Sequence, residues 1–298
     1  MNEQQRNSAQ AATEAIGRAI VVGKEYRPGH VLRIEEIEQK LAISRAMARE
    51  VLQALHSMRL VDLKPRVGAT VQALHSWNVL HPAVIEWRLD SASSERLWKS
   101  LTQLRGAVEP AAARLAATRA PADICRDLVT LAFELKELGE TRPFDKTIRG
   151  RYRDVDARFH AAMLAGSLNE MFVGFTDPVI KVLNHRIDQE LPDPDASRRG
   201  TPKRTAREFP DHPEAVSLWL HVFLAQAIEQ GQSRAAEFFS RGILAETLGD
   251  LRTDQDLDRG IAECLDDVAL AEADREQFRV ELARALAAED VVTLGSHR

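Results

Sequence analysis

The chain has 298 residues, of which 44% are hydrophobic and 29% charged, and its formal net charge is −5. That length is about twice the usual size of a domain and predicts two domains, and no stretch approaches the roughly 20 apolar residues of a membrane span, which predicts a soluble, cytoplasmic protein. The chain has only two cysteines, Cys125 and Cys264, which excludes a disulfide framework and a cysteine-based zinc site.

The first 75 residues differ from the rest of the chain in charge and predict a small helical domain. They carry a net charge of +3, whereas the remaining residues carry −8, so an anionic partner is expected for the front part alone. Ala12, Ile16 and Ile20 recur every four residues and predict a first helix. A turn at residues 27–29 separates it from a second short helix at about residues 34–41.

A third helix and a hairpin are predicted to complete this domain. Ser44 is a favourable N-cap residue for a helix that runs to about residue 58. Residues 60–63 and 69–72 have the composition of two short strands, and residues 64–68 form the turn between them. Three helices closed by a small hairpin are the order of a winged helix-turn-helix domain.

The charged residues of this segment fit binding to DNA. Arg45 and Arg49 lie one turn apart on the exposed face of the third helix, where they can reach guanine edges or phosphates. Lys64 and Arg66 in the hairpin can add phosphate or minor-groove contacts, and Gly68 allows close approach of the backbone. The alternative is an ordinary pair of amphipathic helices with solvated arginines.

Two motifs in this domain resemble the GntR family of bacterial transcription regulators. Residues 43–52, ISRAMAREVL, resemble the family signature VSRTPVREAL, and residues 63–71, LKPRVGATV, resemble its wing. Glu35 stands where many members place a DNA-contacting arginine, and Arg33 is near enough to substitute for it. The resemblance implies that a homodimer binds double-stranded operator DNA through residues Arg33, Ser44, Arg45, Arg49, Lys64, Arg66 and Gly68.

The remainder of the chain is predicted to be mainly α-helical. Residues 77–89, WNVLHPAVIEWRL, resemble the connector of the FadR branch of that family, so a linker at 76–92 is expected to pack against a domain. Helical periodicity dominates residues 93–250 and predicts an all-α helical bundle. Residues 191–212 are rich in Pro, Gly, Ser and charge, and are expected to form a loop.

Three motifs in the predicted bundle resemble the FCD ligand-binding domain of FadR-type regulators. They are LRGAVEPAA at residues 104–112, DARFH at 156–160 and HVFLAQAI at 221–228. The resemblance implies an effector that is a small carboxylic or sugar acid, bound by Arg105, which would face the cavity, and by Asn169. The alternative is that Arg105 is a long side chain that snorkels at the bundle surface.

The same resemblance proposes a metal site. Asp156 and His160 are four residues apart on one helix, so both can face one point, and His221 would come from a facing helix. A carboxylate with imidazoles suits Zn, Ni or Mn. The family's fourth ligand, a histidine, is replaced here by Ile243. Either a divalent metal is held by three ligands, or the three side chains form a hydrogen-bonded polar cluster.

Residues 251–298 extend beyond the resemblance. They hold 12 acidic and 6 basic residues, and their apolar spacing predicts helices that cap the bundle, join a dimer interface or stay loosely attached. The whole sequence thus predicts a DNA-binding transcription regulator, most simply a repressor, that is not an enzyme. The alternatives are a metal-dependent enzyme using Asp156, His160 and His221, and an architectural DNA-binding protein without a ligand.

Overall fold

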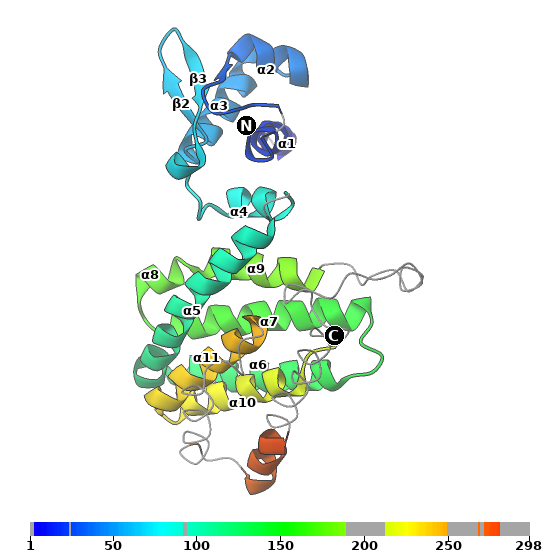
Figure 1. Cartoon of the computed structure of the whole chain (residues 1–298), viewed down its shortest axis with the longest axis vertical. Helices are drawn as coiled ribbons and strands as arrows, with labels where there is room; N and C mark the ends of the chain where they lie inside the picture. The colour runs from blue at the N-terminus through cyan, green and yellow to red at the C-terminus, as the bar shows by residue number, and fades with distance from the viewer. Residues whose placement is uncertain are drawn as a thin grey trace, which may run out of the picture. The chain divides into compact units, whose positions relative to one another are not determined.

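The computed structural model of the chain describes residues 3–23, 25–91, 94–188, 212–248, 268 and 271–280. The chain divides into two compact units, residues 1–97 and residues 98–298. Each unit is described by itself below, and Figure 1 labels their helices and the strands β2 and β3.

The first unit is a three-helix domain with a small sheet. Its elements are α1 (Glu3–Val21), β1 (Val31–Leu32), α2 (Ile34–Leu41), α3 (Arg45–Ser57), β2 (Val61–Lys64) and β3 (Gly68–Val71). The predicted three helices and hairpin, and with them the winged helix-turn-helix fold, are confirmed. The sequence did not predict β1, which pairs antiparallel with β3 and makes the strand order β1-β3-β2.

Local backbone chemistry explains where these elements begin and end. Ser44 caps α3, because its Oγ accepts a hydrogen bond from Met47 N at 3.3 Å. Ala42 ends α2 in the left-handed region with φ of 51°. Gly68 starts β3 with φ of +118°, and a Cβ there would lie 2.8 Å from the carbonyl oxygen of Leu32. The pairing of β1 with β3 therefore requires glycine at this position.

The connector after the sheet folds onto the first unit. Its helix α4 (Pro82–Leu89) packs on α1, where Trp87 is 3% exposed and occupies the space beside Gly17. Arg18 of α1 adds an ion pair of 2.8 Å with Asp90 at the end of α4. The predicted linker thus packs as expected, and Trp77 and Trp87 both contribute to the core of this unit.

The second unit is a helical bundle, and its described residues contain no strand. Its helices are α5 (Ser94–Arg119), α6 (Ala122–Glu140), α7 (Lys146–Gly166), α8 (Glu170–Val173), α9 (Thr176–Asp188), α10 (Ala215–Glu229) and α11 (Ser233–Leu248). Neighbouring helices pack in the order α9, α7, α6, α10 and α11 (Figure 1). Because α10 is buried along almost its whole length, it forms the centre of the core. Among the described residues no helix is both long and apolar enough to cross a membrane.

Part of the predicted C-terminal extension packs on this bundle. Val268 and Phe278 are fully buried, and the Phe278 ring lies 4.9 Å from that of Phe223 in α10, measured between centroids. These contacts favour the first of the three expected roles, in which the extension caps the bundle. The rest of residues 251–298, and the loop predicted at 191–212 up to residue 211, lie outside the described residues.

Candidate functional site

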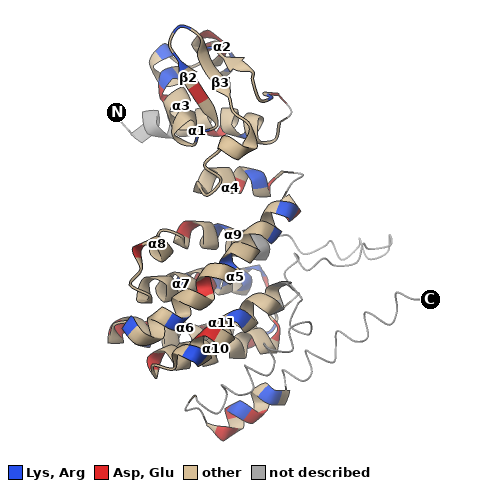
Figure 2. Cartoon of the chain, turned by 60° about the vertical axis from the view of Figure 1, so that its left-hand side comes forward, with Lys and Arg blue, Asp and Glu red and all other residues tan. Residues whose placement is uncertain are grey.

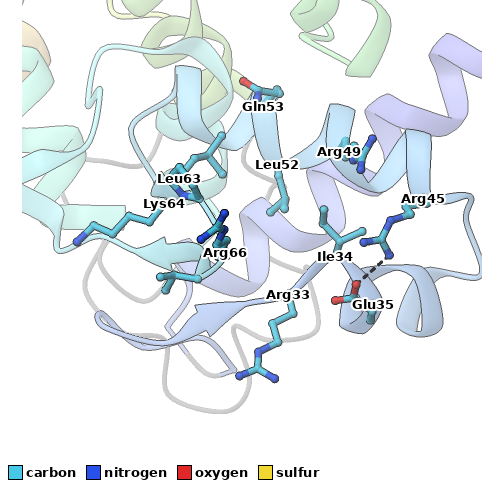
Figure 3. A pocket seen from close by; sticks show the side chains of 13 residues that line it. Arg33, Ile34, Glu35, Arg45, Arg49, Leu52, Gln53, Leu63, Lys64 and Arg66 are labelled. Carbon is cyan, nitrogen blue, oxygen red and sulfur yellow. Dashed lines mark hydrogen bonds and ion pairs between the residues drawn. The ribbon is translucent and has the colours of Figure 1, made fainter.

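A basic hollow of about 770 Å³ opens on the first unit, between α2, α3 and the turn from β2 to β3. Figure 3 shows the side chains that line it, and Figure 2 shows the Lys and Arg segments on this unit in blue. Six of the seven residues that the sequence proposed for DNA binding line the hollow: Arg33, Arg45, Arg49, Lys64, Arg66 and Gly68. The fold therefore gathers cations from three separate segments onto one surface.

The five cations of the hollow do not have equal charge environments. Arg45 is tied to α2, with Nη1 2.8 Å from Glu35 Oε1 and 3.3 Å from Glu38 Oε2. A hydrogen bond to its own backbone and the contact with Arg45 lower the pKa of Glu35, so this carboxylate is ionised. Within the described residues, Arg33, Arg49 and Arg66 form no ion pair. These three arginines are exposed and available to an anionic partner.

Two of the proposed DNA-contact residues already have a structural role. The Ser44 side chain caps α3, and the close backbone approach at Gly68 is to Leu32 within the sheet. A contact of either residue with DNA remains a prediction.

A second site lies inside the helical unit, where five ionisable side chains are buried. Their i,i+4 spacing aligns Arg105 with Glu109 on α5 and Asp156 with His160 on α7, and His221 faces them from α10. Their exposed fractions are 1% for Arg105, 1% for Glu109, 5% for Asp156, 1% for His160 and 2% for His221.

A continuous series of contacts joins these side chains. Arg105 binds Glu109 through two atoms, with Nε 2.6 Å from Oε1 and Nη2 3.3 Å from Oε2. The Oε2 atom of Glu109 also lies 2.9 Å from His160 Nδ1. Asp156 Oδ1 lies 3.7 Å from His160 Nε2 and 3.5 Å from His221 Nε2.

Which ring nitrogen of each histidine carries the proton decides what the site can bind. His221 Nδ1 lies 2.7 Å from the carbonyl oxygen of Ser217, which only accepts, so the ring carries its proton on Nδ1. His160 Nδ1 lies 2.9 Å from the Glu109 carboxylate without meeting the geometry of a hydrogen bond, and the negative charge of that carboxylate favours a proton on this nitrogen. In the neutral rings both Nε2 lone pairs then face Asp156, and His221 Nε2 has no hydrogen-bond partner among the described residues.

Lone pairs that converge on a carboxylate repel each other unless a cation lies between them. One ligand atom from each of Asp156, His160 and His221 lies within 4.8 Å of the others, so these residues could hold a metal ion. Without a metal, the repulsion would also be removed if protonated imidazoles of His160 and His221 donated hydrogen bonds to Asp156. Burial alone would raise the pKa of Asp156, but His221, His160 and Arg105 outweigh it and lower that pKa, so the carboxylate is ionised in either case.

No fourth ligand from the protein is found near these three among the described residues. Ile243 is 4% exposed and belongs to the apolar core. Glu109 contacts the Nδ1 side of His160, so it orients the ring and cannot share a metal with Nε2. Sequence reasoning missed Glu109, although its position one turn after Arg105 was visible.

The two residues proposed for the effector have different environments. Arg105 is fully buried, and its Nε and Nη2 already bind Glu109. The snorkelling alternative is therefore wrong. Asn169 caps α8, because its Oδ1 accepts a hydrogen bond from Met171 N at 3.0 Å.

Comparison with known proteins gives the same division of the chain. Residues 9–71 match the family described as "Bacterial regulatory proteins, gntR family", and residues 100–246 match the FCD domain. The chain is 35% identical over 150 residues to the galactonate operon transcriptional repressor of Escherichia coli, spanning 50% of this chain and 62% of that protein. It is 28% identical over 172 residues to the uncharacterized HTH-type transcriptional regulator YieP of Escherichia coli, spanning 57% and 72% of the two chains.

A solved structure, Streptococcus agalactiae GntR, covers 81% of this chain and 99% of its own, with 18% identity and a TM-score of 0.42. The chain spans less than two thirds of the length of the galactonate repressor. Each family match lies within one of the two units.

The buried Glu109 makes stability depend on pH. Burial opposes its ionisation, but Arg105 and His160 outweigh burial and hold its pKa at about 2, against an ordinary 4.5. Since the folded pKa is the lower one, the stabilisation is complete above about pH 4.5 and is lost as the pH falls toward 2. We expect Glu109→Gln to lower the free energy of unfolding by about 3–5 kcal/mol at neutral pH, because it leaves Arg105 unpaired.

Urea unfolding of the full chain at a series of pH values measures this effect, and the loss should shrink as the pH is lowered. Glu140→Gln is the matched control, because Glu140 forms an i,i+4 pair with Lys136 at 2.7 Å but its side chain is 51% exposed. The control substitution should lower the free energy of unfolding by less than about 1 kcal/mol. Equal effects of the two substitutions would contradict the assignment.

Proposed function

Because the chain belongs to the GntR family of bacterial regulatory proteins and carries an FCD domain, we propose that it is a DNA-binding transcription regulator controlled by a small acid. The observation that carries this proposal is the basic hollow between α3 and the wing. The name of the galactonate operon repressor supports repression as the mode of action. A cytoplasmic location follows from this proposal, because operator DNA is found in the bacterial cytoplasm.

The N-terminal end of α3 enters the major groove of the operator in this proposal. A helix presents its first residues to base edges there, and an arginine fork matches the O6 and N7 atoms of guanine. Arg45 and Arg49 have this role, whereas Arg33, Lys64 and Arg66 bind phosphates. One such helix reads only a few base pairs, so the protein acts as a homodimer on a two-fold operator.

The buried site of the helical unit binds the effector. Arg105 is a bidentate anion partner, and Asp156, His160 and His221 suit hydroxyl groups better than an acyl chain. The effector is therefore a small carboxylate such as a sugar acid, a hydroxy acid or a dicarboxylic acid, in line with the galactonate operon named for the relative. Because Arg105 already binds Glu109, the effector carboxylate has to share or displace that partner.

A divalent ion, Zn, Ni or Mn, is held by Asp156, His160 and His221 in this proposal. When bound, it supplies positive charge and open coordination positions for an effector carboxylate. The Nε2 atom of His221 lies 3.5 Å from Asp156 Oδ1 but forms no hydrogen bond with the described residues, which supports the metal over the polar cluster. A metal-dependent enzyme is the weaker alternative, because a winged helix-turn-helix unit has no role in such a reaction.

Loss of Arg49 should impair sequence reading, and loss of Arg66 should weaken binding to all DNA. Arg49→Ala is expected to cost about 1–3 kcal/mol on the preferred sequence and to relax preference at one position. Arg66→Ala is expected to weaken binding uniformly and to reduce the salt slope by about 1. Gel-shift titration at several salt concentrations separates the two effects. Unchanged operator affinity in an Arg45/Arg49 double alanine variant would refute the proposal that this surface binds DNA.

Metal content tests the buried site. Protein purified without a His tag should contain Zn, Ni or Mn, or take one up at micromolar concentration, and His221→Ala should abolish uptake. His212→Ala is the control, because this histidine lies at the start of the segment before α10 and outside the group. Absence of uptake by the unaltered chain would leave the polar cluster as the explanation.

A thermal-shift screen of organic acids tests the effector. Small hydroxy and sugar acids should raise the melting temperature, and these shifts should vanish in Arg105→Lys, which keeps the charge but loses the fork. The DNA affinity of that variant without effector should persist. Hits restricted to neutral or cationic compounds, or an unaltered response of the variant, would exclude the carboxylate site.

A further inference from the structure

The basic hollow contains one residue with the wrong charge for a DNA-binding surface. Glu35 is the single carboxylate among the residues that line it, beside five Lys and Arg side chains. Its side chain is 58% exposed, so burial does not explain its presence. A carboxylate at such a place repels every phosphate that approaches, and this repulsion lowers affinity for DNA of any sequence.

The position of Glu35 relative to Arg45 offers a compensating gain. Arg45 is the first residue of α3, and its Nη1 lies 2.8 Å from Glu35 Oε1 (Figure 3). The second carboxylate that Arg45 contacts, that of Glu38, lies 3.3 Å from the same Nη1 atom. Among the described residues no hydrogen bond or ion pair involves Nε or Nη2, and these two atoms are a pair of donors that can face two acceptors side by side.

We propose that Glu35 is a specificity-determining residue of this surface: it holds the Arg45 guanidinium so that its free edge reads a base, and it keeps Arg45 from binding phosphates. The proposal rests on the DNA-binding function proposed above.

Two physical effects act in the same direction. Holding Nη1 restricts the rotation of a long side chain, so less conformational entropy is lost when Nε and Nη2 bind the O6 and N7 atoms of a guanine. A phosphate, in contrast, attracts any arginine that is free to reach it and carries no sequence information. Pairing Arg45 with Glu35 removes one such contact from unrelated DNA, so the ratio of specific to non-specific affinity rises.

The experiment uses the full chain and two duplexes. One is enriched from a library of randomised duplexes by the unaltered protein, and the other is a mixed-sequence duplex of the same length. Glu35→Gln should bind the mixed-sequence duplex about 3- to 10-fold more tightly, and the slope of log K against log salt should become steeper by about 1, because one more phosphate is contacted. Discrimination between the two duplexes should fall by a similar factor.

Glu36→Gln is the matched control. It changes the charge of the same helix by the same amount, but Glu36 does not line the hollow, and its carboxylate lies 3.8 Å from His30. We expect this variant to keep the discrimination of the unaltered chain. An equal effect of Glu36→Gln would show that net charge alone matters and would overturn the proposal.

A double-mutant cycle tests whether Glu35 acts through Arg45. In an Arg45→Ala background, Glu35→Gln should leave both discrimination and salt slope unchanged. An effect that persists without Arg45 would show that Glu35 contacts DNA directly, for example a cytosine amino group, and would overturn the positioning role. If the unaltered chain enriches no sequence, the proposed function fails together with this inference; if it does, and Glu35→Gln discriminates equally well, this inference alone fails.

Discussion

The burial of Glu109 is the constraint on which the helical unit depends. A carboxylate removed from water is unstable unless other groups replace its hydration, and Arg105 and His160 do so from two sides. His160 in turn lies against Asp156, and Asp156 against His221, whose second nitrogen is held by the Ser217 carbonyl. Helices α5, α7 and α10 thus share one polar cluster in an otherwise apolar bundle, and replacing Arg105 or Glu109 alone would leave the other as a buried charge without its main partner.

For the effector proposed above, this arrangement would give the helical unit a physical means of responding. A carboxylate that reaches Arg105 competes with Glu109, and Glu109 also contacts His160. A change at Arg105 is therefore passed to the histidine that faces the proposed metal position. Since the contacting side chains lie on three different helices, a new distribution of charge in the cluster changes which relative positions of those helices are favourable.

The first unit differs from the helical unit, because the charged side chains of its candidate site are exposed to solvent rather than buried. Exposed cations contribute little to folding stability, and salt screens them, so their value lies in attracting and reading a charged polymer. Among the described residues Arg33, Arg49 and Arg66 form no ion pair, whereas Arg45 is held by Glu35 of α2. In the function proposed above, Arg33 and Arg66 contribute affinity, whereas Arg45 and Arg49 contribute discrimination.

The sequence by itself determined the helices and the residue types of both sites. Apolar residues four apart marked α1, Ser44 marked the start of α3, and the i,i+4 spacing placed Asp156 beside His160. These signals are local, because a helix brings residues one turn apart to the same face whatever else surrounds it.

The tertiary structure decided what depends on distant segments. Strand β1 has only two residues and exists because β3 offers it partners, and α4 folds onto α1 because Trp87 fits beside Gly17. The pairing of Arg45 with Glu35 and the burial of Glu109 against Arg105 and His160 likewise join residues whose charge was visible but whose surroundings were not. Charge and periodicity are properties of a segment, whereas burial and pairing are set by which helices pack together, so only the folded chain fixes them.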